Sequence, residues 1–587
     1  REFNNCQLTS TALPRSRGYY CGVAQPISKL TIGQRSDLFP NPGVDRDRLR
    51  AALSAKFNFM DGYELVSVTG YSKEDYHIEI DVSYAGYDAF GLLDSPALTP
   101  PAAGAAGDGA RQFRNKGSFW RLQDEFREDF SQELRLRSPS DRALRWTLGA
   151  YFYKQNDDFT REDKVTPDGR IVPNGAAAIA YRDVENEAIF GGLEYDFNDQ
   201  WTATAEFRHA KDTKKQVGAQ YTTTPVAASR CAAGGDGIQI STSPTTGCVI
   251  SSGVRVQTAP FAGTFTSDKP RFTLRYKMTP DITFFANYAE GNKPGGFNSA
   301  TVIPLLEAIG KTAAYDEEES ENFEVGGKFR LLDGRVFASL TYFDTKLFNQ
   351  QLTQNIVGLN AAGAVIANSY IENVGKTNSS GIELEVTARL TERLDLSLGG
   401  AYVDAKIKEY VNQDQADLYS NRPASAFSVI SATNPGGCGT LTGTAAANAA
   451  ACLALRNLDN AQFGSVAGKR TPRAPEYNGY AILKYTMPLT GDMDLSLGGD
   501  VVYESSKFAQ VHNLIETGAR TYFNARIGVE TDTWSVSLWG KNLGDDDTGL
   551  DILRYIDSRN IASPSTRGFA VTLPRPRQVG ITANYKF

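Results

Sequence analysis

The chain ends in Arg-Pro-Arg-Gln-Val-Gly-Ile-Thr-Ala-Asn-Tyr-Lys-Phe, residues 575–587. From Val579 onward every second residue is apolar, and the residues between them are small or polar. Side chains in a β-strand alternate sides, so this stretch predicts a strand with one apolar and one polar face. It ends on an aromatic residue, whereas the termini of soluble domains are usually polar and frayed. Two interpretations are open: the last strand of a soluble sandwich, or a strand between lipid and a water-filled lumen.

Composition does not separate these interpretations by itself. The mean hydropathy of −0.35 over 587 residues is that of a soluble protein, and no run of about eighteen apolar residues predicts a transmembrane helix. Membrane barrels escape that test because their apolar residues recur at every second position. The net charge of −7, without a basic tract, argues against a nucleic acid partner. The chain begins at Arg1 without a signal peptide, and we expect that processing or truncation removed it.

Hairpins with short turns alternate with long linkers along the whole chain, for instance the linkers 213–265 and 409–473. Each hairpin has two alternating segments joined by two to five residues rich in Gly, Asp, Asn or Pro. The segments are near 47–59 and from 63, 126–138 and 143–156, 184–197 and 201–212, 269–279 and 282–291, 320–331 and 335–349, 380–390 and 394–408, 476–487 and 493–506, and 519–530 and 534–543. Long loops at one end and short turns at the other are typical of an outer-membrane barrel. The sequence therefore predicts an all-β fold, a large antiparallel transmembrane β-barrel with about seventeen strands in this chain.

The two faces of these strands differ in charge. Leu384 and Val386 share one face of a predicted strand, and Glu383 and Glu385 share the other. We expect the charged face to line a wide, wet lumen and the apolar face to contact lipid. Aromatic residues beside the short turns predict a girdle at the periplasmic interface: Phe59, Tyr63, Phe197, Trp201, Phe329, Tyr485, Trp534, Tyr585 and Phe587.

The strand count has a consequence for closure. The first and the last predicted strand both follow a long loop, so both run toward the periplasm. Two strands of the same direction cannot close an antiparallel barrel, and bacterial barrels have even strand numbers. We therefore expect an open seam, with at least one strand before Arg1.

Six cysteines form three local pairs in loop-like stretches: Cys6 and Cys21, Cys231 and Cys248, and Cys438 and Cys452. Pairs of this kind predict disulfides and an oxidising compartment. Free thiols paired by chance are the alternative. A metal site is less compatible, because no CxxC spacing occurs and the histidines lie far from these cysteines in sequence.

Several motifs resemble those of TonB-dependent outer-membrane receptors. They are residues 284–298 (Phe-Phe-Ala-Asn-Tyr-Ala-Glu-Gly-Asn-Lys-Pro-Gly-Gly-Phe-Asn), 318–328, 373–375 with 380–385, 539–543 (Trp-Gly-Lys-Asn-Leu) and the terminal Phe587. The resemblance covers about 47–587 and implies a barrel of the 22-strand type around a plug. By this comparison 1–46 is a partial extracellular loop, 47–587 is the barrel, and the plug, the TonB box and the first strands are absent.

The resemblance also implies a function. It implies active uptake of a scarce, large nutrient, most often a ferric siderophore, across the outer membrane of a Gram-negative bacterium. The implied partners are outer-membrane lipid, the TonB complex acting through a plug and TonB box, the barrel assembly machinery acting on the C-terminal strand, and the nutrient ligand. No cofactor is implied. The alternatives are uptake of an oligosaccharide, a plant aromatic or a cobalamin, a passive porin, or a barrel enzyme using His77, His209 or His512 as a base. No catalytic motif surrounds those histidines, so we do not expect an enzyme.

Candidate ligand contacts lie in the long loops. Tyr84 and Tyr87 belong to an aromatic-rich loop, and Lys293, Phe297 and Asn298 flank two glycines. Aromatic and cationic side chains of this kind suit an aromatic ligand or an iron chelate. Loop packing is the alternative for the tyrosines. For Gly295-Gly296 itself we expect a turn at the external rim, which needs positive φ.

Overall fold

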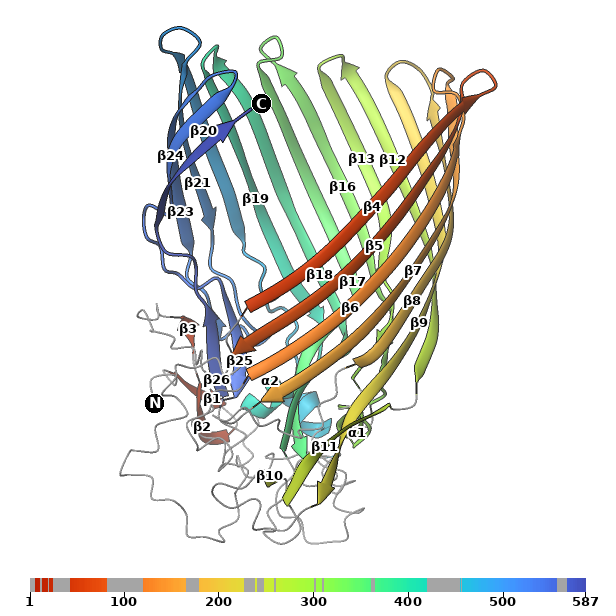
Figure 1. Cartoon of the computed structure of the whole chain (residues 1–587), viewed down its shortest axis with the longest axis vertical. Helices are drawn as coiled ribbons and strands as arrows, with labels where there is room; N and C mark the ends of the chain where they lie inside the picture. Colours follow the sequence, from red (N-terminus) through yellow and green to blue (C-terminus); the bar gives the residue numbers. More distant parts are fainter. Residues whose placement is uncertain are drawn as a thin grey trace.

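The strands of the chain are long and curve together into the wall of a barrel (Figure 1). The structure is a computed structural model, and it describes residues 6–10, 13–19, 21–24, 43–81, 120–164, 179–225, 238–239, 248–257, 260–299, 302–308, 311–359, 365–419, 454, 457–556 and 567–586. No described helix is long and apolar enough to cross a membrane.

Seventeen strands build the wall, as the sequence predicted. They are β4 (Gly43–Phe59), β5 (Tyr63–Asp81), β6 (Trp120–Arg137), β7 (Leu144–Lys164), β8 (Ile179–Asp196), β9 (Trp201–Pro225), β12 (Phe261–Thr279), β13 (Ile282–Lys293), β16 (Glu318–Leu331), β17 (Val336–Leu359), β18 (Val365–Thr391), β19 (Leu394–Glu409), β20 (Tyr477–Pro488), β21 (Asp494–Glu504), β23 (Arg520–Glu530), β24 (Trp534–Lys541) and β27 (Gln578–Tyr585). Each pairs antiparallel with the next, and β9 pairs directly with β12. Two further strands, β10 (Ile238–Gln239) and β11 (Cys248–Gln257), extend the sheet beside the outer end of β9.

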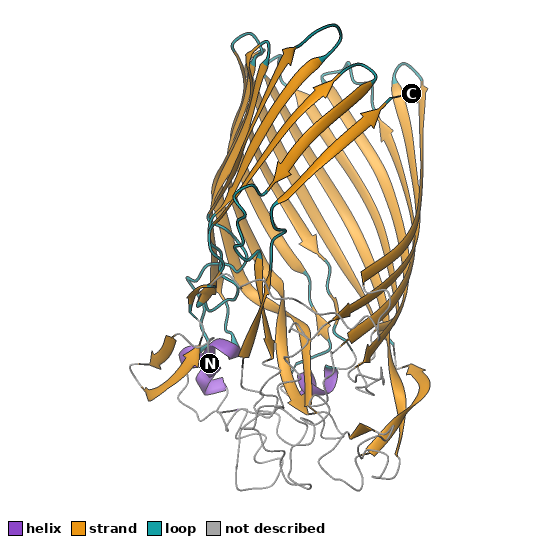
Figure 2. Ribbon diagram, turned by 60° about the vertical axis from the view of Figure 1, so that its left-hand side comes forward, coloured by secondary structure: helices purple, strands orange, loops and turns teal. Residues whose placement is uncertain are grey.

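The short turns all lie at one end of the barrel, the upper rim in Figure 1, and the described parts of the long connections lie at the other. In the first turn, Met60, Asp61 and Gly62 have φ of 39°, 43° and 100°, and the β16–β17 turn uses positive φ at Leu332, Asp333 and Gly334. Positive φ at the centre of a hairpin matches the right-handed twist of its strands. Figure 2 shows the helices only at the opposite end, which we call the outer mouth.

Smaller elements gather at the outer mouth. They are β1 (Cys6–Ser10), β2 (Leu13–Tyr19), β3 (Gly22–Val23), β14 (Gly296–Phe297), α1 (Ile303–Ala308), β15 (Ala314–Tyr315), α2 (Gln413–Tyr419), β22 (Ile515–Glu516), β25 (Asp551–Ile556) and β26 (Arg567–Thr572). Near the beginning of the chain, β3 pairs with β22 in parallel. The described residues 21–24 therefore dock on the connection between β21 and β23. The first wall strand begins at Gly43, slightly before the predicted 47.

Apolar side chains point away from the wall on one face of nearly every strand and remain exposed in the isolated chain. Leu53 is 68% exposed, Ile189 64% and Ile581 72%. A soluble protein rarely exposes so much contiguous apolar surface, whereas a barrel in lipid requires it. Charged side chains occupy the other face, as predicted: Glu383 and Glu385 alternate with Leu384 through an unshifted register with β17.

The predicted aromatic girdle lies beside the short turns. The rings of Phe59 and Tyr63 are 6.1 Å apart, and Tyr63 lies 6.1 Å from the Trp146 ring. Trp201 and Tyr276 stack at 4.4 Å farther along the wall. Amphipathic rings at one level around a barrel mark a membrane–water interface.

The antiparallel ladder has two ends, β4 and β27. Both run toward the rim with the short turns, and Figure 1 draws their upper ends well apart. Among the described residues, the register of β4 is with β5 and that of β27 is with β24, and no register joins β4 to β27. Nearly all of β4 is exposed. This is the open seam that strand parity predicted, and not the complete ladder of a smaller, closed porin.

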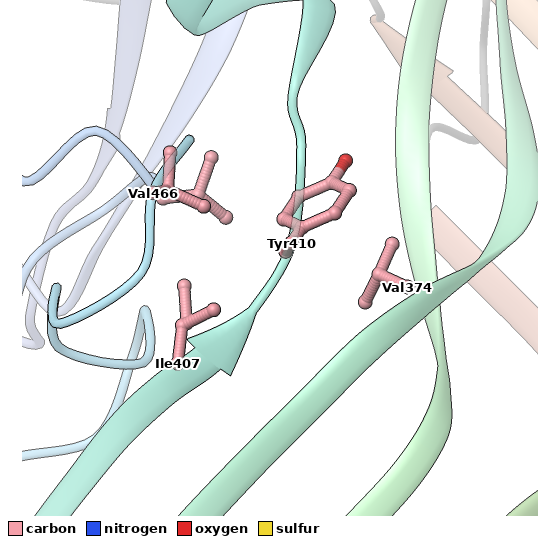
Figure 3. Packing of buried hydrophobic residues seen from close by; sticks show 5 residues of the cluster. Val374, Ile407, Tyr410 and Val466 are labelled. Carbon is pink, nitrogen blue, oxygen red and sulfur yellow. The ribbon is translucent and has the colours of Figure 1, made fainter. Parts of the chain in front are cut away.

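Compact apolar packing occurs at the outer mouth. There Val374, Ile407, Tyr410, Val466 and Val511 form a buried cluster, with Val374 and Ile407 only 2% and 1% exposed (Figure 3). The cluster joins the outer ends of β18 and β19 to two later connections. It therefore fixes the shape of the mouth where the strands no longer contact lipid.

Candidate functional site

One connection crosses the outer mouth. We call residues 294–317, between β13 and β16, the mouth loop; within it β14 pairs with β15. Asn298 is 5% exposed, and its side chain brackets the backbone of Ile371 in β18. Asn298 Nδ2 donates to the Ile371 carbonyl at 3.0 Å, and the Ile371 N–H donates to Asn298 Oδ1 at 2.7 Å. The Asn298 carbonyl accepts a hydrogen bond from Gln216 Nε2 of β9 at 3.2 Å.

These contacts place the mouth loop on the inside of the barrel. The two strands that Asn298 touches, β9 and β18, are separated by five strand spacings in the sheet, about 24 Å along the wall at 4.7–4.9 Å each. On the concave side of the curved sheet, the straight distance between β9 and β18 is shorter than the distance along the wall. A single residue can therefore contact both strands only from that side. The mouth loop therefore lies over the lumen.

Two amide side chains hold the ends of the mouth loop. Gln351 Nε2 of β17 donates toward the carbonyls of Lys293 (3.2 Å), Pro294 (3.1 Å) and Asp316 (3.0 Å). Asn373 of β18 donates to the Asp316 carbonyl at 2.9 Å and accepts from the Asp316 N–H at 2.6 Å. These hydrogen bonds fix both loop ends against the β17–β18 hairpin, so the loop is a built part of the mouth.

The two glycines of the mouth loop serve close packing. A Cβ on Gly295 would lie 2.3 Å from Phe265 Cε1 and 2.5 Å from the Tyr315 carbonyl, and one on Gly296 would lie 2.4 Å from Tyr315 Oη. Neither glycine has the positive φ that a rim turn would need. The expectation of such a turn is wrong, because the glycines let the loop backbone approach rings of β12 and β15.

A cavity of about 670 Å³ lies between the mouth loop and the wall. Its lining comes from β6 to β9, the mouth loop, and the outer ends of β17 and β18. The lining residues are Arg127, Gln155, Arg182, Val184, Asp212, Lys214, Lys215, Gln216, Pro294, Gly296, Phe297, Asn298, Ser299, Tyr315, Thr353, Tyr370 and Ile371. Four of these side chains are cationic and one, Asp212, is anionic. The volume lies within the usual range of small-molecule sites.

A buried carboxylate positions two of the cations. Asp157 of β7 is 1% exposed, and it accepts from Arg127 Nε at 2.8 Å and from Arg182 Nε at 2.9 Å. Gln155 Nε2 donates to the same carboxylate at 2.9 Å. The Arg127 and Arg182 side chains themselves are 36% and 39% exposed, so their remaining N–H groups face the cavity and solvent. Asp157 thus orients two guanidinium groups without covering them.

Lys214 and several aromatic rings form the rest of the cavity lining. Lys214 Nζ donates to the Gly295 carbonyl at 2.7 Å and lies 5.7 Å from the centre of the Phe265 ring. Phe297 stacks on Phe261 with ring centres 5.8 Å apart. Burial raises the pKa of Tyr315, so its phenol stays protonated and can donate a hydrogen bond. The cavity therefore offers cationic donors beside flat apolar surfaces.

Only some of the predicted ligand residues line the cavity. Phe297 and Asn298 line the cavity, although the Asn298 amide is occupied by Ile371. Lys293 is not part of the lining. Tyr84 and Tyr87 lie outside the described residues. Their contact with a ligand stays a prediction for all five.

The sequence did not single out Arg127, Arg182, Lys214 or Tyr370. Each sits in a long strand that carries many other polar residues, so its place in the sequence does not distinguish it. The available signal was position: charged residues recur near the outer ends of four successive strands, β6 to β9.

One predicted disulfide is partly described. Cys21 is disulfide-bonded, and no described cysteine is free. Its side chain packs against the buried Leu418. Cys231, Cys438 and Cys452 lie outside the described residues, as do the side chains of Cys6 and Cys248, so all three pairings stay predictions.

We expect non-reducing peptide mapping to recover three linked peptides, joining Cys6 to Cys21, Cys231 to Cys248 and Cys438 to Cys452. Each closes a loop of about fifteen residues, worth roughly 3 kcal/mol in the chain-entropy model. Mass spectrometry after digestion without reductant measures the linkage. Linked peptides that join different loops, or unmodified thiols, would contradict these pairings.

Neither a metal site nor a catalytic base occurs in the described parts of the chain. No group of three or more His, Cys, Asp or Glu side chains lies close enough there to hold a metal ion. His77 and His209 contact Asp124 and Asp268 across neighbouring strands, at 2.6 and 2.8 Å. These contacts account for both histidines as members of cross-strand pairs.

Comparison with known proteins identifies the same architecture. Residues 10–543 match the family described as TonB dependent receptor-like, beta-barrel. A metal-pseudopaline receptor, CntO of Pseudomonas aeruginosa, is 29% identical over 161 residues, which are 27% of this chain and 20% of CntO.

Two solved receptor structures resemble the barrel of this chain over nearly its full length. The ferric yersiniabactin uptake receptor FyuA of Yersinia pestis has a TM-score of 0.59 at 14% identity, covering 93% of this chain and 62% of FyuA. The siderophore receptor PiuA of Acinetobacter baumannii has a TM-score of 0.55 at 13% identity, covering 92% of this chain and 64% of PiuA. The chain thus spans less than two thirds of the length of these relatives, and at such identities the likeness concerns the fold alone.

Proposed function

Because the chain belongs to the TonB-dependent receptor family, we propose that it supplies the barrel of an active transporter in the outer membrane of a Gram-negative bacterium. In this proposal residues 47–587 are the barrel and residues 1–46 are part of an extracellular loop. TonB would deliver energy through a plug domain, and the barrel assembly machinery would act on the C-terminal strand. The chain is not an enzyme; its family consists of transporters.

The proposed substrate is an anionic metal chelate of the ferric siderophore type. The observation that carries this proposal is the cavity of about 670 Å³ under the mouth loop, where Arg127, Arg182 and Lys214 belong to the lining on the lumen face of their strands. Arg127 and Arg182 keep exposed N–H groups while Asp157 fixes their orientation. Charge-assisted hydrogen bonds to carboxylate or catecholate oxygens are strong and directional. CntO and PiuA, a metal-pseudopaline receptor and a siderophore receptor, take up ligands of a class that agrees with this proposal.

The other transport alternatives fit this cavity less well. A neutral oligosaccharide offers no anion to the exposed guanidinium groups of Arg127 and Arg182, whereas an anionic chelate would add charge-assisted hydrogen bonds to them. A passive porin would have a complete ladder, whereas β4 and β27 share no register among the described residues.

Growth of a deletion strain on single iron sources tests the function. We expect the strain to lose growth on an anionic ferric chelate and to recover when the full-length gene is restored.

The full-length protein with Arg182→Gln and Lys214→Gln is expected to bind the chelate roughly tenfold or more weakly, because charged hydrogen bonds are lost. Binding is measured by quenching of tryptophan fluorescence in the purified full-length protein.

Lys277→Gln with Lys328→Gln is the matched control. Both lysines lie on the lumen face near the short turns, far along their strands from the cavity. The control should bind the chelate as the wild type does. Equal binding by the cavity variant, or equal loss in the control, would contradict the assignment of this cavity.

A further inference from the structure

Two carboxamide side chains lie directly opposite each other at the outer end of the β17–β18 hairpin. Gln351 of β17 is the register partner of Asn373 of β18. Opposite residues of an antiparallel pair share one face of the sheet, and here both side chains reach the mouth loop. The Asp316 carbonyl accepts from both, at 3.0 Å from Gln351 Nε2 and at 2.9 Å from Asn373 Nδ2. We call these two side chains the amide clamp, because together they hold the end of the loop that leads into β16.

Gln351 also holds the other end of the mouth loop. Its Nε2 lies 3.2 Å from the Lys293 carbonyl and 3.1 Å from the Pro294 carbonyl. The Gln351 side chain is buried, and its Oε1 has no hydrogen-bond partner among the described residues. Because an unpaired buried acceptor is unfavourable, the contribution of this carboxamide comes from its N–H groups. A side chain of similar size without those donors would fill the same space and leave the loop ends unclamped.

The Pro294 carbonyl connects the amide clamp to the cavity. Lys214 Nζ of β9 lies 3.5 Å from that carbonyl and donates to the carbonyl of the next residue, Gly295, at 2.7 Å. One loop carbonyl thus lies between the Gln351 amide and the Lys214 ammonium group. Lys214 belongs to the cavity lining and Gln351 does not. Gln351 therefore acts on the cavity through the loop backbone.

The backbone between these two contacts has little freedom to absorb a displacement. Proline fixes φ at position 294. Gly295 packs so closely against the Phe265 ring and the Tyr315 carbonyl that an added Cβ would clash with both. The same Phe265 ring lies 5.7 Å from Lys214 Nζ. A shift of the Pro294 carbonyl is therefore transmitted to the group that holds the lysine.

From these contacts we propose that Gln351 is a positioning residue for Lys214, because its carboxamide fixes the loop carbonyls that hold the Lys214 ammonium group at the cavity. An ammonium group has three N–H donors, and two loop carbonyls lie within reach of this one. One donor then remains for an anionic ligand. Burial lowers the pKa of Lys214, and carbonyls that accept from the ammonium group oppose that effect. The consequence for a ligand rests on the proposed function, whereas the position of the lysine does not.

Labelling of Lys214 in the ligand-free, full-length protein tests the inference. Pulsed acetylation followed by mass spectrometry gives the rate at Lys214 relative to Lys215, its exposed neighbour in β9. Gln351→Met keeps the length of the side chain and removes its donors. We expect this variant to raise the ratio about fivefold, because the charge-assisted hydrogen bonds of Lys214 are weakened. An unchanged ratio would overturn the inference.

Gln350→Met is the matched control, since it makes the same change at the preceding position, whose side chain projects to the opposite face of the strand. The Oε1 of Gln350 also lacks a partner among the described residues. The control should keep the wild-type ratio, and an equal rise in both variants would contradict a specific role for Gln351. If Gln351→Met does not fold, Gln351→Asn, whose amide is one methylene shorter, should still raise the ratio measurably. No rise there would refute the inference as well.

Binding of ferric catecholate, formed from iron and catechol, measures the consequence for a ligand. We expect Gln351→Met to bind it about fivefold more weakly and Gln350→Met to bind it as the wild type does. Wild-type affinity in Lys214→Gln would contradict the proposed function, and the labelling ratio alone would then decide the role of Gln351. Weakened binding by Lys214→Gln together with wild-type affinity in Gln351→Met would overturn the inference for the chelate.

Discussion

Replacing Leu384 by Arg is expected to destabilise the folded protein in a bilayer by roughly 2–4 kcal/mol. Leu384 is 41% exposed in the isolated chain and lies opposite Leu340 of β17 and Gly400 of β19. It sits on the apolar face of β18, and its neighbour Leu340 lies about midway along β17 between the short turn and Asp344, the first charged residue on that face. A guanidinium group placed there would be transferred from water into lipid and would have no hydrogen-bond partner.

Glu385→Arg provides the control on the adjacent, opposite face. That side chain points to the wet lumen, where a reversed charge should change stability by less than about 1 kcal/mol. Denaturant unfolding of both full-length variants in vesicles, followed by tryptophan fluorescence, gives the two differences. If Glu385→Arg proved the more destabilising change, the assignment of the two faces would be reversed and the argument for a wet lumen would fail.

Alternation and turn chemistry were sufficient to predict the membrane part of the wall. The predicted segments 320–331 and 476–487 correspond to Glu318–Leu331 and Tyr477–Pro488. Both segments meet lipid on one side and water on the other, and that asymmetry produces a clear period of two. Strand parity followed from the same count, and the structure shows the open seam that it requires.

The same signal disappears outside the membrane. The strands predicted to end at 349 and begin at 380 extend to Leu359 and from Val365. Outside the membrane both faces of this hairpin meet water or other loops, so polar residues such as Gln350 and Gln351 occupy successive positions. The cavity belongs to this region. Its cations are brought together only by the curvature of the sheet, which a linear pattern does not encode.

Each residue of the family motif Asn373-Val374-Gly375 makes a specific tertiary contact at the outer mouth. Asn373 clamps the end of the mouth loop through Asp316. Val374 is 2% exposed in the cluster shown in Figure 3. Gly375 lies against the backbone of Glu409 in β19. Three successive residues thus make three different tertiary contacts, and none of these contacts is visible in the alternation of the strand.

Gly375→Ala is expected to destabilise the protein by about 3 kcal/mol, near the upper end of the usual range for overpacking. A Cβ at this position would lie 1.5 Å from the carbonyl oxygen of Glu409 and 2.4 Å from its carbonyl carbon. Both are backbone atoms, so no side-chain rotation relieves the contact and the outer ends of β18 and β19 must separate. That movement would also loosen Val374 from Ile407 and Tyr410 in the neighbouring cluster.

Gly498→Ala in β21 is the matched control, because the nearest atom to its added Cβ is the Leu483 carbonyl oxygen at 3.9 Å. That substitution should change stability by less than about 0.5 kcal/mol. Denaturant midpoints of the full-length variants measure both effects, and limited proteolysis near residue 410 reports whether the mouth has opened. Equal midpoints for the two variants would show that β18 and β19 accommodate a side chain at Gly375. The close approach of the two strands would then have no part in holding the mouth loop over the lumen.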